Sequence, residues 1–111
     1  MAPTTLLGQK TATTPLGRRE KYEGRPLRIP EMLAVLPGVY SLERTSCDSP
    51  GQINKAKIAI REAFKNQIDN KGFSLVEVLS MCPTYWGLSA VESLDWIKNV
   101  MSKEFPLGKI K

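Results

Sequence analysis

The sequence predicts an α/β fold built on a mostly parallel sheet, and three observations support this prediction. A dense apolar run, Phe73–Leu79, is interrupted only by Ser74 and Glu77. A second extended run, residues 39–45, comes earlier in the chain, and a long amphipathic segment, residues 49–70, lies between the two. A helix that joins two strands in this order is typical of the right-handed crossover of a parallel sheet.

The first thirty residues are expected to form a long irregular segment. They contain four prolines, three glycines and five threonines, and no helical or strand period persists through them. Segments of this length without secondary structure are uncommon in compact domains unless they serve a function or are disordered. Residues 30–37 then predict a short helix, with Pro30 near its first turn and Pro37-Gly38 at its end.

Residues 31–111 are predicted to form a βαβα unit within a single domain. Its first strand, residues 39–45, alternates apolar and polar side chains, so one of its faces is expected to be less buried. Ser49-Pro50-Gly51-Gln52 has the pattern of a capping box and predicts the start of the first helix. A second capping box, Ser89-Ala90-Val91-Glu92, predicts the start of the last helix.

The two predicted helices are amphipathic. The first carries five apolar residues on one stripe, which is expected to be its buried side, and its basic residues lie largely outside that stripe. The members of the stripe are Ile53, Ala56, Ile60, Ala63 and Phe64. The last helix repeats apolar residues at the spacing of a packed face, at Val91, Leu94, Ile97 and Met101.

The second predicted strand is apolar on both faces. Val76 and Val78 lie on one face, and Phe73, Leu75 and Leu79 on the other. Such a strand is usually a central one in a parallel sheet, but only two strands are legible in this sequence. Each buried unpaired backbone group costs about 1–3 kcal/mol. The sheet is therefore expected to be incomplete without more chain or a partner.

Composition excludes several classes of function. A chain of 111 residues allows one domain. It contains no histidine, which removes the commonest general base, the Cys-His and Ser-His nucleophile pairs and the usual zinc sites. No apolar run approaches a membrane span, and the first residues lack the pattern of a signal peptide. With two cysteines and no export signal, we expect a reducing, cytoplasmic location, which disfavours a structural disulfide between Cys47 and Cys82.

The net charge of +5 is concentrated near the N-terminus. Residues 1–30 carry six basic and two acidic side chains, whereas the remaining residues carry ten basic and nine acidic ones. A basic excess could suggest nucleic acid, but this segment has a single aromatic residue, Tyr22, and lacks the stacking series of single-strand binders. A solvated or subunit-facing loop without nucleic-acid binding is the favoured interpretation.

Three separated motifs stand out along the chain. One is Phe-Ser-Leu-Val-Glu-Val-Leu-Ser-Met-Cys-Pro-Thr-Tyr-Trp-Gly at 73–87. Another is Gln-Lys-Thr-Ala-Thr-Thr-Pro-Leu-Gly at 9–17, preceded by Met-Ala-Pro-Thr-Thr. The third is Trp-Gly-Leu-Ser-Ala-Val-Glu-Ser-Leu-Asp-Trp at 86–96, followed by Phe-Pro-Leu-Gly. In their order along the chain, these motifs resemble the C-terminal part of the β subunit of 2-oxoacid:ferredoxin oxidoreductases, in the branch that acts on 2-oxoglutarate or branched-chain 2-oxoacids.

The resemblance covers essentially the whole chain, but only the C-terminal half of a family subunit. It implies part of the thiamin-diphosphate-binding fold, and the family's Mg²⁺-diphosphate motif and three further cysteines are not in this sequence. The implied reaction is oxidative decarboxylation of a 2-oxoacid, with 2-oxoglutarate expected first, to an acyl-coenzyme A, with electrons passed to ferredoxin. Thiamin diphosphate, Mg²⁺ and an iron–sulfur cluster are implied for the complete subunit and are not expected in this fragment alone.

The resemblance also implies partners and site residues. The partners are the missing N-terminal half of the β subunit, the α, γ and ferredoxin-like δ subunits, coenzyme A and ferredoxin, in a hetero-oligomer without a membrane component. The cysteine of the Cys-Pro-Thr turn completes the four-thiolate shell of the family's cluster, so Cys82 is expected to be a metal ligand. A packed or solvent-facing thiol is the alternative. Four threonines of the N-terminal loop are expected to lie near the cofactor without a direct role: Thr4, Thr5, Thr13 and Thr14. No catalytic residue is assigned.

Four other residues are expected to have structural roles. Cys47 is treated as structural, and Glu77 is expected to pair with a basic neighbour, although a buried carboxylate can also have a raised pKa and act in catalysis. Trp86 and Trp96 are expected to be core or interface aromatics.

Two alternatives to the enzyme subunit stay open: a small non-catalytic module that binds a partner through its basic N-terminal arm, and a subunit of a cluster-free thiamin enzyme.

Overall fold

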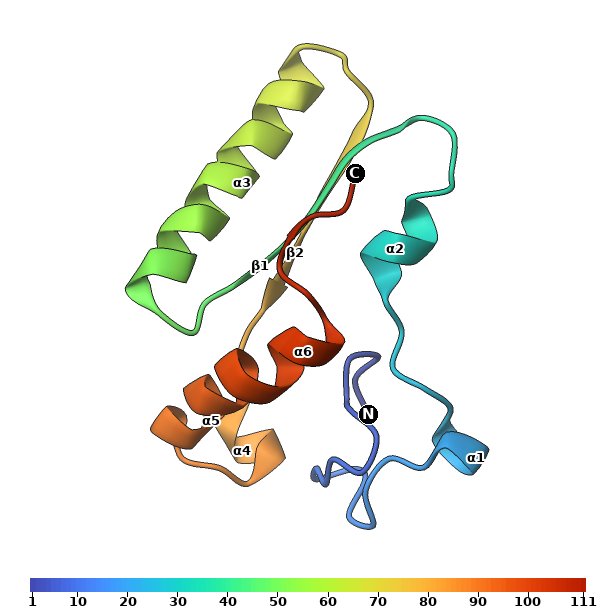
Figure 1. Cartoon of the computed structure of the whole chain (residues 1–111), viewed down its shortest axis with the longest axis vertical. Coiled ribbons are helices and arrows are strands. Elements are labelled where there is room, and N and C mark those ends of the chain that lie inside the picture. Colours follow the sequence, from blue (N-terminus) through green and yellow to red (C-terminus); the bar gives the residue numbers. More distant parts are fainter.

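The computed structural model describes residues 1–111 and confirms the α/β class (Figure 1). In chain order the elements are α1 (Glu20–Glu23), α2 (Ile29–Leu33), β1 (Val39–Ser46), α3 (Pro50–Ile68), β2 (Phe73–Leu79), α4 (Pro83–Trp86), α5 (Ala90–Trp96), the π-helical turn η1 (Ile97–Met101), α6 (Ser102–Glu104) and β3 (Gly108–Lys109). Figure 1 shows α3 on one side of the strands, α2 on the other, and the C-terminal helices at the carboxyl end of the strands.

The sheet has three strands in the order β2-β1-β3. β1 and β2 pair in parallel, with Leu42 opposite Leu75 and Arg44 opposite Glu77. β3 pairs antiparallel with β1 and was not foreseen, because two residues are too short to carry a strand pattern. The expectation that Phe73–Leu79 is a central strand is wrong within this chain: β1 is central, and β2 has an unpaired edge. The sheet is incomplete in the sense that its most apolar strand lies at the edge.

The N-terminal segment is irregular, as predicted, but a single buried side chain orders it. The Arg18 side chain donates six hydrogen bonds, all to backbone carbonyls of this segment. Its Nε and Nη2 donate to the carbonyls of Gly24 and Arg25, each at 2.7 Å, and its Nη1 donates to Pro3 and Thr5 at 3.0 and 2.9 Å. Because a guanidinium has five N–H donors in a rigid fork, one residue satisfies carbonyls that no helix or strand would bind.

The short helix that follows is shorter than predicted. α2 ends at Leu33 rather than near residue 37, and the chain then makes turns as far as Gly38, which has a φ of 83°. Pro30 is buried in its first turn, whereas Met32 and Leu36 are exposed. The apolar spacing of Met32 and Leu36 therefore does not mark a packed face here.

The long helix α3 begins as predicted but packs through a different face. Ser49 Oγ accepts a hydrogen bond from the Gln52 N–H at 3.3 Å, and Pro50 occupies the first helical position. The buried apolar residues of the helix are Ala56 and Ala59. The expectation that the stripe of Ile53, Ile60 and Phe64 is buried is wrong, because all three are exposed. The small alanines lie against the sheet, and the larger side chains lie beside that contact line.

The apolar core lies on the side of the sheet away from α3. Leu79 at the end of β2 packs with Leu6 of the N-terminal segment and with three residues of the C-terminal helices and the loop that follows them, Ile97, Met101 and Phe105. This cluster joins segments that are about as far apart in sequence as the chain allows. The core therefore depends on the irregular N-terminal segment as well as on the βαβα unit.

The last helix confirms its predicted capping box. Glu92 N–H donates to Ser89 Oγ at 3.2 Å, and Ser89 N–H donates to Glu92 Oε2 at 2.8 Å. The predicted packed face is correct only in part, because Ile97 is buried and Val91 is 69% exposed. The change from α-helix to a π-helical turn at Ile97 inserts an extra residue per turn and rotates the apolar face.

Candidate cofactor pocket at the carboxyl end of the sheet

Cys82 lies just beyond the carboxyl end of β2, where ligands bind in open α/β sheets. It is the N-cap residue of α4, and Pro83 occupies the first position of that helix. Its carbonyl accepts a hydrogen bond from the Trp86 N–H at 2.9 Å. Gly87, with a φ of 68°, ends the helix in the left-handed conformation that favours glycine. This one-turn helix presents the thiol of Cys82 as an exposed, free cysteine.

A pocket of about 260 Å³ lies beside this turn, between two segments that are distant in sequence. The N-terminal segment contributes Thr4, Thr5 and Gln9 to its wall. The segment that runs from β2 through α4 contributes Glu77, Ser80, Cys82, Tyr85 and Trp86, and Ala2, Val78, Leu79 and Met101 complete the lining. The pocket therefore forms between the N-terminal segment and the end of the sheet, and it requires the contact between the two.

The structure divides the four threonines that were expected near the cofactor. Thr4 and Thr5 line the pocket together with Cys82, and Thr5 is buried. Thr13 and Thr14 do not line it. Thr13 instead forms a hydrogen bond with the phenol of Tyr85, and Thr14 forms one of 2.5 Å with Thr11. Proximity to a cofactor stays a prediction for all four, and the geometry supports it for Thr4 and Thr5 only.

Tyr85 is a polar group of this pocket that the sequence did not single out. Hydrogen bonds from the hydroxyls of Thr11 and Thr13, with the Met1 ammonium nearby, lower the pKa of Tyr85 to about 8. The Ala12 N–H also donates to the Tyr85 carbonyl at 2.9 Å. These contacts cross more than seventy residues of sequence, so no local pattern could have indicated them. Tyr85 fastens the N-terminal segment to the turn that carries Cys82.

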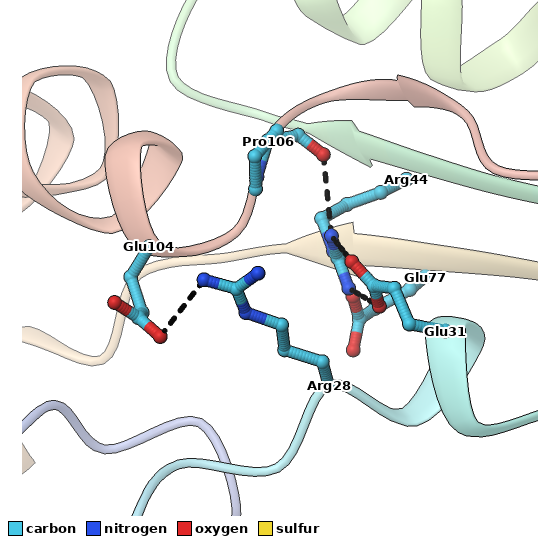
Figure 2. Close-up of polar contacts among 6 residues, drawn as sticks. All are labelled: Arg28, Glu31, Arg44, Glu77, Glu104 and Pro106. Carbon is cyan, nitrogen blue, oxygen red and sulfur yellow. Dashed lines mark hydrogen bonds and ion pairs between the residues drawn. The ribbon is translucent and has the colours of Figure 1, made fainter.

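A buried ion-pair cluster lies behind the pocket (Figure 2). The side chain of Arg44 is completely buried. Its Nε donates to Glu77, its Nη1 and Nη2 donate to the two carboxylate oxygens of Glu31 at 2.7 and 2.6 Å, and Nη1 also donates to the Pro106 carbonyl at 3.2 Å. The guanidinium lies 5.3 Å from the ring centre of Phe105. The expectation that Glu77 pairs with a basic neighbour is confirmed.

The cluster links the pocket to the rest of the fold. Glu77 lines the pocket and binds Arg44 of the neighbouring strand, and Arg44 in turn binds α2 through Glu31. The hydrogen bonds from Arg44 lower the pKa of Glu31 below its ordinary value. Figure 2 also shows a separate, more exposed pair, in which Arg28 donates to Glu104 at 3.2 Å. Sequence reasoning missed Arg44, because its role depends on the strand register that places it opposite Glu77.

This chain can supply one thiolate to an iron–sulfur cluster at the pocket, but not a complete ligand set. Cys82 is exposed at the pocket rim, as a ligand would have to be. The structure contains no group of three His, Cys, Asp or Glu side chains that could hold a metal ion. Cys47 is half-buried, and its Sγ donates to the Leu79 carbonyl at 3.4 Å. The residues present therefore fit a single cluster ligand, and a four-thiolate shell would need cysteines from outside this chain.

The basic N-terminal residues are largely engaged within the chain. Arg18 is buried, Arg19 pairs with Glu23 at 3.1 Å, and Arg25 pairs with Glu20 at 2.7 Å. Internal pairing of this kind leaves a weaker basic surface than the charge count suggests.

None of the helices combines the length and the apolar character that spanning a membrane requires.

Comparison with known proteins gives a consistent result. Over all 111 residues the chain is 44% identical to the ketoisovalerate oxidoreductase subunit VorA of Methanothermobacter thermautotrophicus, of which it covers 23%. It is 37% identical over 98 residues to the 2-oxoglutarate synthase subunit KorB of Archaeoglobus fulgidus, of which the match covers 32%. It is 30% identical over 113 residues to KorB of Methanocaldococcus jannaschii, of which the match covers 37%.

The chain thus spans between about a quarter and somewhat more than a third of the length of these curated relatives. No protein-family model matches it. No solved structure matches it significantly. Along its whole length, the chain is a homologue of one segment of the subunits of 2-oxoacid oxidoreductases.

Proposed function

We propose that this chain is the C-terminal part of the β subunit of a 2-oxoacid:ferredoxin oxidoreductase, and that Cys82 supplies one thiolate ligand to the iron–sulfur cluster of the complete subunit. The observation that carries the proposal is the position of Cys82. Its thiol is exposed at the rim of the pocket that Thr4 and Thr5 also line, beyond the carboxyl end of β2. The similarity of this whole chain to one segment of VorA and of the KorB of Methanocaldococcus jannaschii supports the assignment to an oxidoreductase subunit.

The reaction proposed for the complete enzyme is oxidative decarboxylation of a 2-oxoacid to an acyl-coenzyme A, with electrons passed to ferredoxin. When bound, thiamin diphosphate and the cluster supply the carbanion chemistry and the electron transfer. The residues of this chain hold and shape the site: α4 presents the thiol, and Arg44 keeps Glu77 in place at the pocket wall. The same proposal has the complete enzyme assemble with other subunits, use coenzyme A as the acyl acceptor and act in the cytoplasm.

The substrate remains a prediction. The motifs led us to expect 2-oxoglutarate first, and KorB relatives carry that substrate in their names. The relatives with 44% identity are named for ketoisovalerate. Because the higher identity is to that group, we propose to test a branched-chain 2-oxoacid alongside 2-oxoglutarate.

The test uses a hybrid subunit, in which this chain replaces the matching segment of VorA from Methanothermobacter thermautotrophicus, assembled with the other subunits of that enzyme. In the hybrid, Cys82→Ala should lower iron and sulfide per protein and weaken the visible absorption of the cluster, while thiamin diphosphate still binds. Cys47→Ala is the matched control, and it should leave the iron content unchanged because Cys47 is half-buried and bound to the Leu79 carbonyl. Full cluster content in Cys82→Ala would remove Cys82 from the ligand set.

A further inference from the structure

Glu77 is the only carboxylate in the lining of the pocket beside Cys82, and no lysine or arginine lines that pocket. It lies on β2, and strand alternation places it on the same face as Leu79, which packs into the core. Its side chain is 17% exposed. A carboxylate so far removed from water is costly unless it is paired, so its pairing decides how much negative charge the pocket senses.

The pairing of Glu77 leaves part of its charge uncompensated. Its carboxylate accepts from Arg44 Nε, whereas both Nη atoms of Arg44 donate to Glu31, at 2.7 and 2.6 Å. Figure 2 shows the two carboxylates bound to this one guanidinium. Since bidentate pairs are the stronger ones, the positive charge of Arg44 is shared mainly with Glu31, which does not line the pocket. One arginine against two carboxylates leaves an excess of negative charge, and Glu77 is the carboxylate that faces the pocket.

We propose that Glu77 lowers the reduction potential of the iron–sulfur cluster to which Cys82 contributes a ligand, so the inference rests on the proposed function. The reduction potential of such a cluster depends on net charge, hydrogen bonds to its sulfurs and exposure to solvent. A nearby negative charge disfavours the arrival of an electron, and a wall of low dielectric preserves that effect. Glu77 acts only through its charge: it forms no bond, moves no proton and accepts no electron.

Arg44 is the positioning residue in this arrangement. Its side chain is completely buried, and its Nη1 also donates to the Pro106 carbonyl at 3.2 Å. The guanidinium therefore has a fixed place between β1, α2 and the C-terminal segment, and it fixes the Glu77 carboxylate at the pocket wall. A charge held in place before the electron arrives needs no reorganisation when it does.

The test measures the midpoint potential of the cluster in the hybrid subunit, by redox titration followed through electron paramagnetic resonance. Glu77→Gln keeps the size of the side chain and an oxygen that can accept from Arg44, but it removes the negative charge. The potential should move to a more positive value, with iron and sulfide per protein unchanged. Glu77→Asp keeps the charge, so its potential should stay closer to that of the unsubstituted hybrid.

The order of these two variants separates charge from packing. If Glu77 only filled space, the shorter aspartate would disturb the site more than the isosteric glutamine does. Glu43→Gln is the matched control, because Glu43 precedes Arg44 on β1 but lines a different cavity, on the α3 side of the sheet. Its loss of charge should shift the potential much less than Glu77→Gln does.

Three outcomes would overturn the inference: an unchanged potential in Glu77→Gln, a larger shift in Glu77→Asp than in Glu77→Gln, or loss of the cluster from Glu77→Gln. The last of these would make Glu77 a structural residue of the site. Failure of the proposed function gives a different result, since it appears as full iron content in Cys82→Ala. An unchanged potential in Glu77→Gln, with Cys82 confirmed as a ligand, would refute the role of Glu77 alone.

Discussion

Arg44 of β1 lies directly opposite Glu77 of β2, and its guanidinium donates to that carboxylate across the parallel ladder while also binding both oxygens of Glu31 (Figure 2). One completely buried arginine thus holds together two strands and the helix α2. A guanidinium suits this position because it can bind one carboxylate in bidentate fashion and still donate to another. The arrangement determines how Glu77 is presented to the pocket.

Arg44→Met is expected to lower the free energy of unfolding by about 3 kcal/mol, because removing one partner of a buried ion pair leaves uncompensated charge. Urea denaturation of the chain measures this change. Arg25→Met is the control, since its pair with Glu20 is exposed on both sides and such pairs contribute about 0–1 kcal/mol. Equal effects of the two substitutions would contradict the structural role of the Arg44 cluster.

Acid should weaken the fold through Glu31. Hydrogen bonds from Arg44 lower the pKa of Glu31 below the ordinary value of 4.5. A carboxyl group whose folded pKa is lowered contributes stability above its unfolded pKa, and this contribution is lost as the pH falls through the folded pKa. The melting temperature should therefore decrease as the pH is lowered below about 4.5. In Glu31→Gln, the melting temperature should depend less on pH in this range. An unchanged profile in Glu31→Gln would place the acid sensitivity elsewhere.

Tyr85 should ionise near pH 8. Its pKa is lowered to about 8 by hydrogen bonds from Thr11 and Thr13 and by the Met1 ammonium. A lowered pKa means that the folded chain stabilises the charged tyrosinate. The free energy of unfolding should therefore increase as the pH rises above the folded pKa of Tyr85. Ultraviolet titration of tyrosinate should show an early step that Tyr85→Phe abolishes and Thr13→Val moves to higher pH. Tyr22→Phe, on α1, should leave that step in place, because Tyr22 is a different phenol from the one that Thr11 and Thr13 bind.

Arg18→Met should loosen the N-terminal segment. The wild-type side chain donates to six carbonyls between Ala2 and Arg25, and a thioether can replace none of these donors. Amide exchange and proteolysis should become faster in residues 2–25 and change little in α3. Arg19→Met provides the comparison, because the Arg19 side chain pairs with Glu23 and lies over the Tyr22 ring but donates to no backbone carbonyl of the segment. Equal protection in both variants would show that the contacts of Leu6 and Tyr85, rather than the Arg18 hydrogen bonds, hold the segment.

Local patterns predicted the site only where the chemistry is local. The Cys-Pro turn after an apolar strand placed Cys82 at the carboxyl end of β2, and the structure agrees. Tyr85 lies three residues further on and was overlooked, because its partner Thr13 is 72 residues away in the sequence. Thr4 and Thr5 share a pocket with Cys82 while Thr13 and Thr14 do not, a distinction that depends on how an irregular segment docks.

The sequence by itself determined the elements whose signals are short-range: the β1–α3–β2 order, the N-cap at Ser49, and the capping box at Ser89. These depend on backbone geometry within one turn or on strand alternation, so neighbouring residues suffice. Only the tertiary structure decided that β1 rather than β2 is central. It also decided that Arg44 is buried between two carboxylates. Both outcomes follow from strand pairing between residues that are distant in the sequence. Neighbouring residues carry no information about the free energy of such pairing.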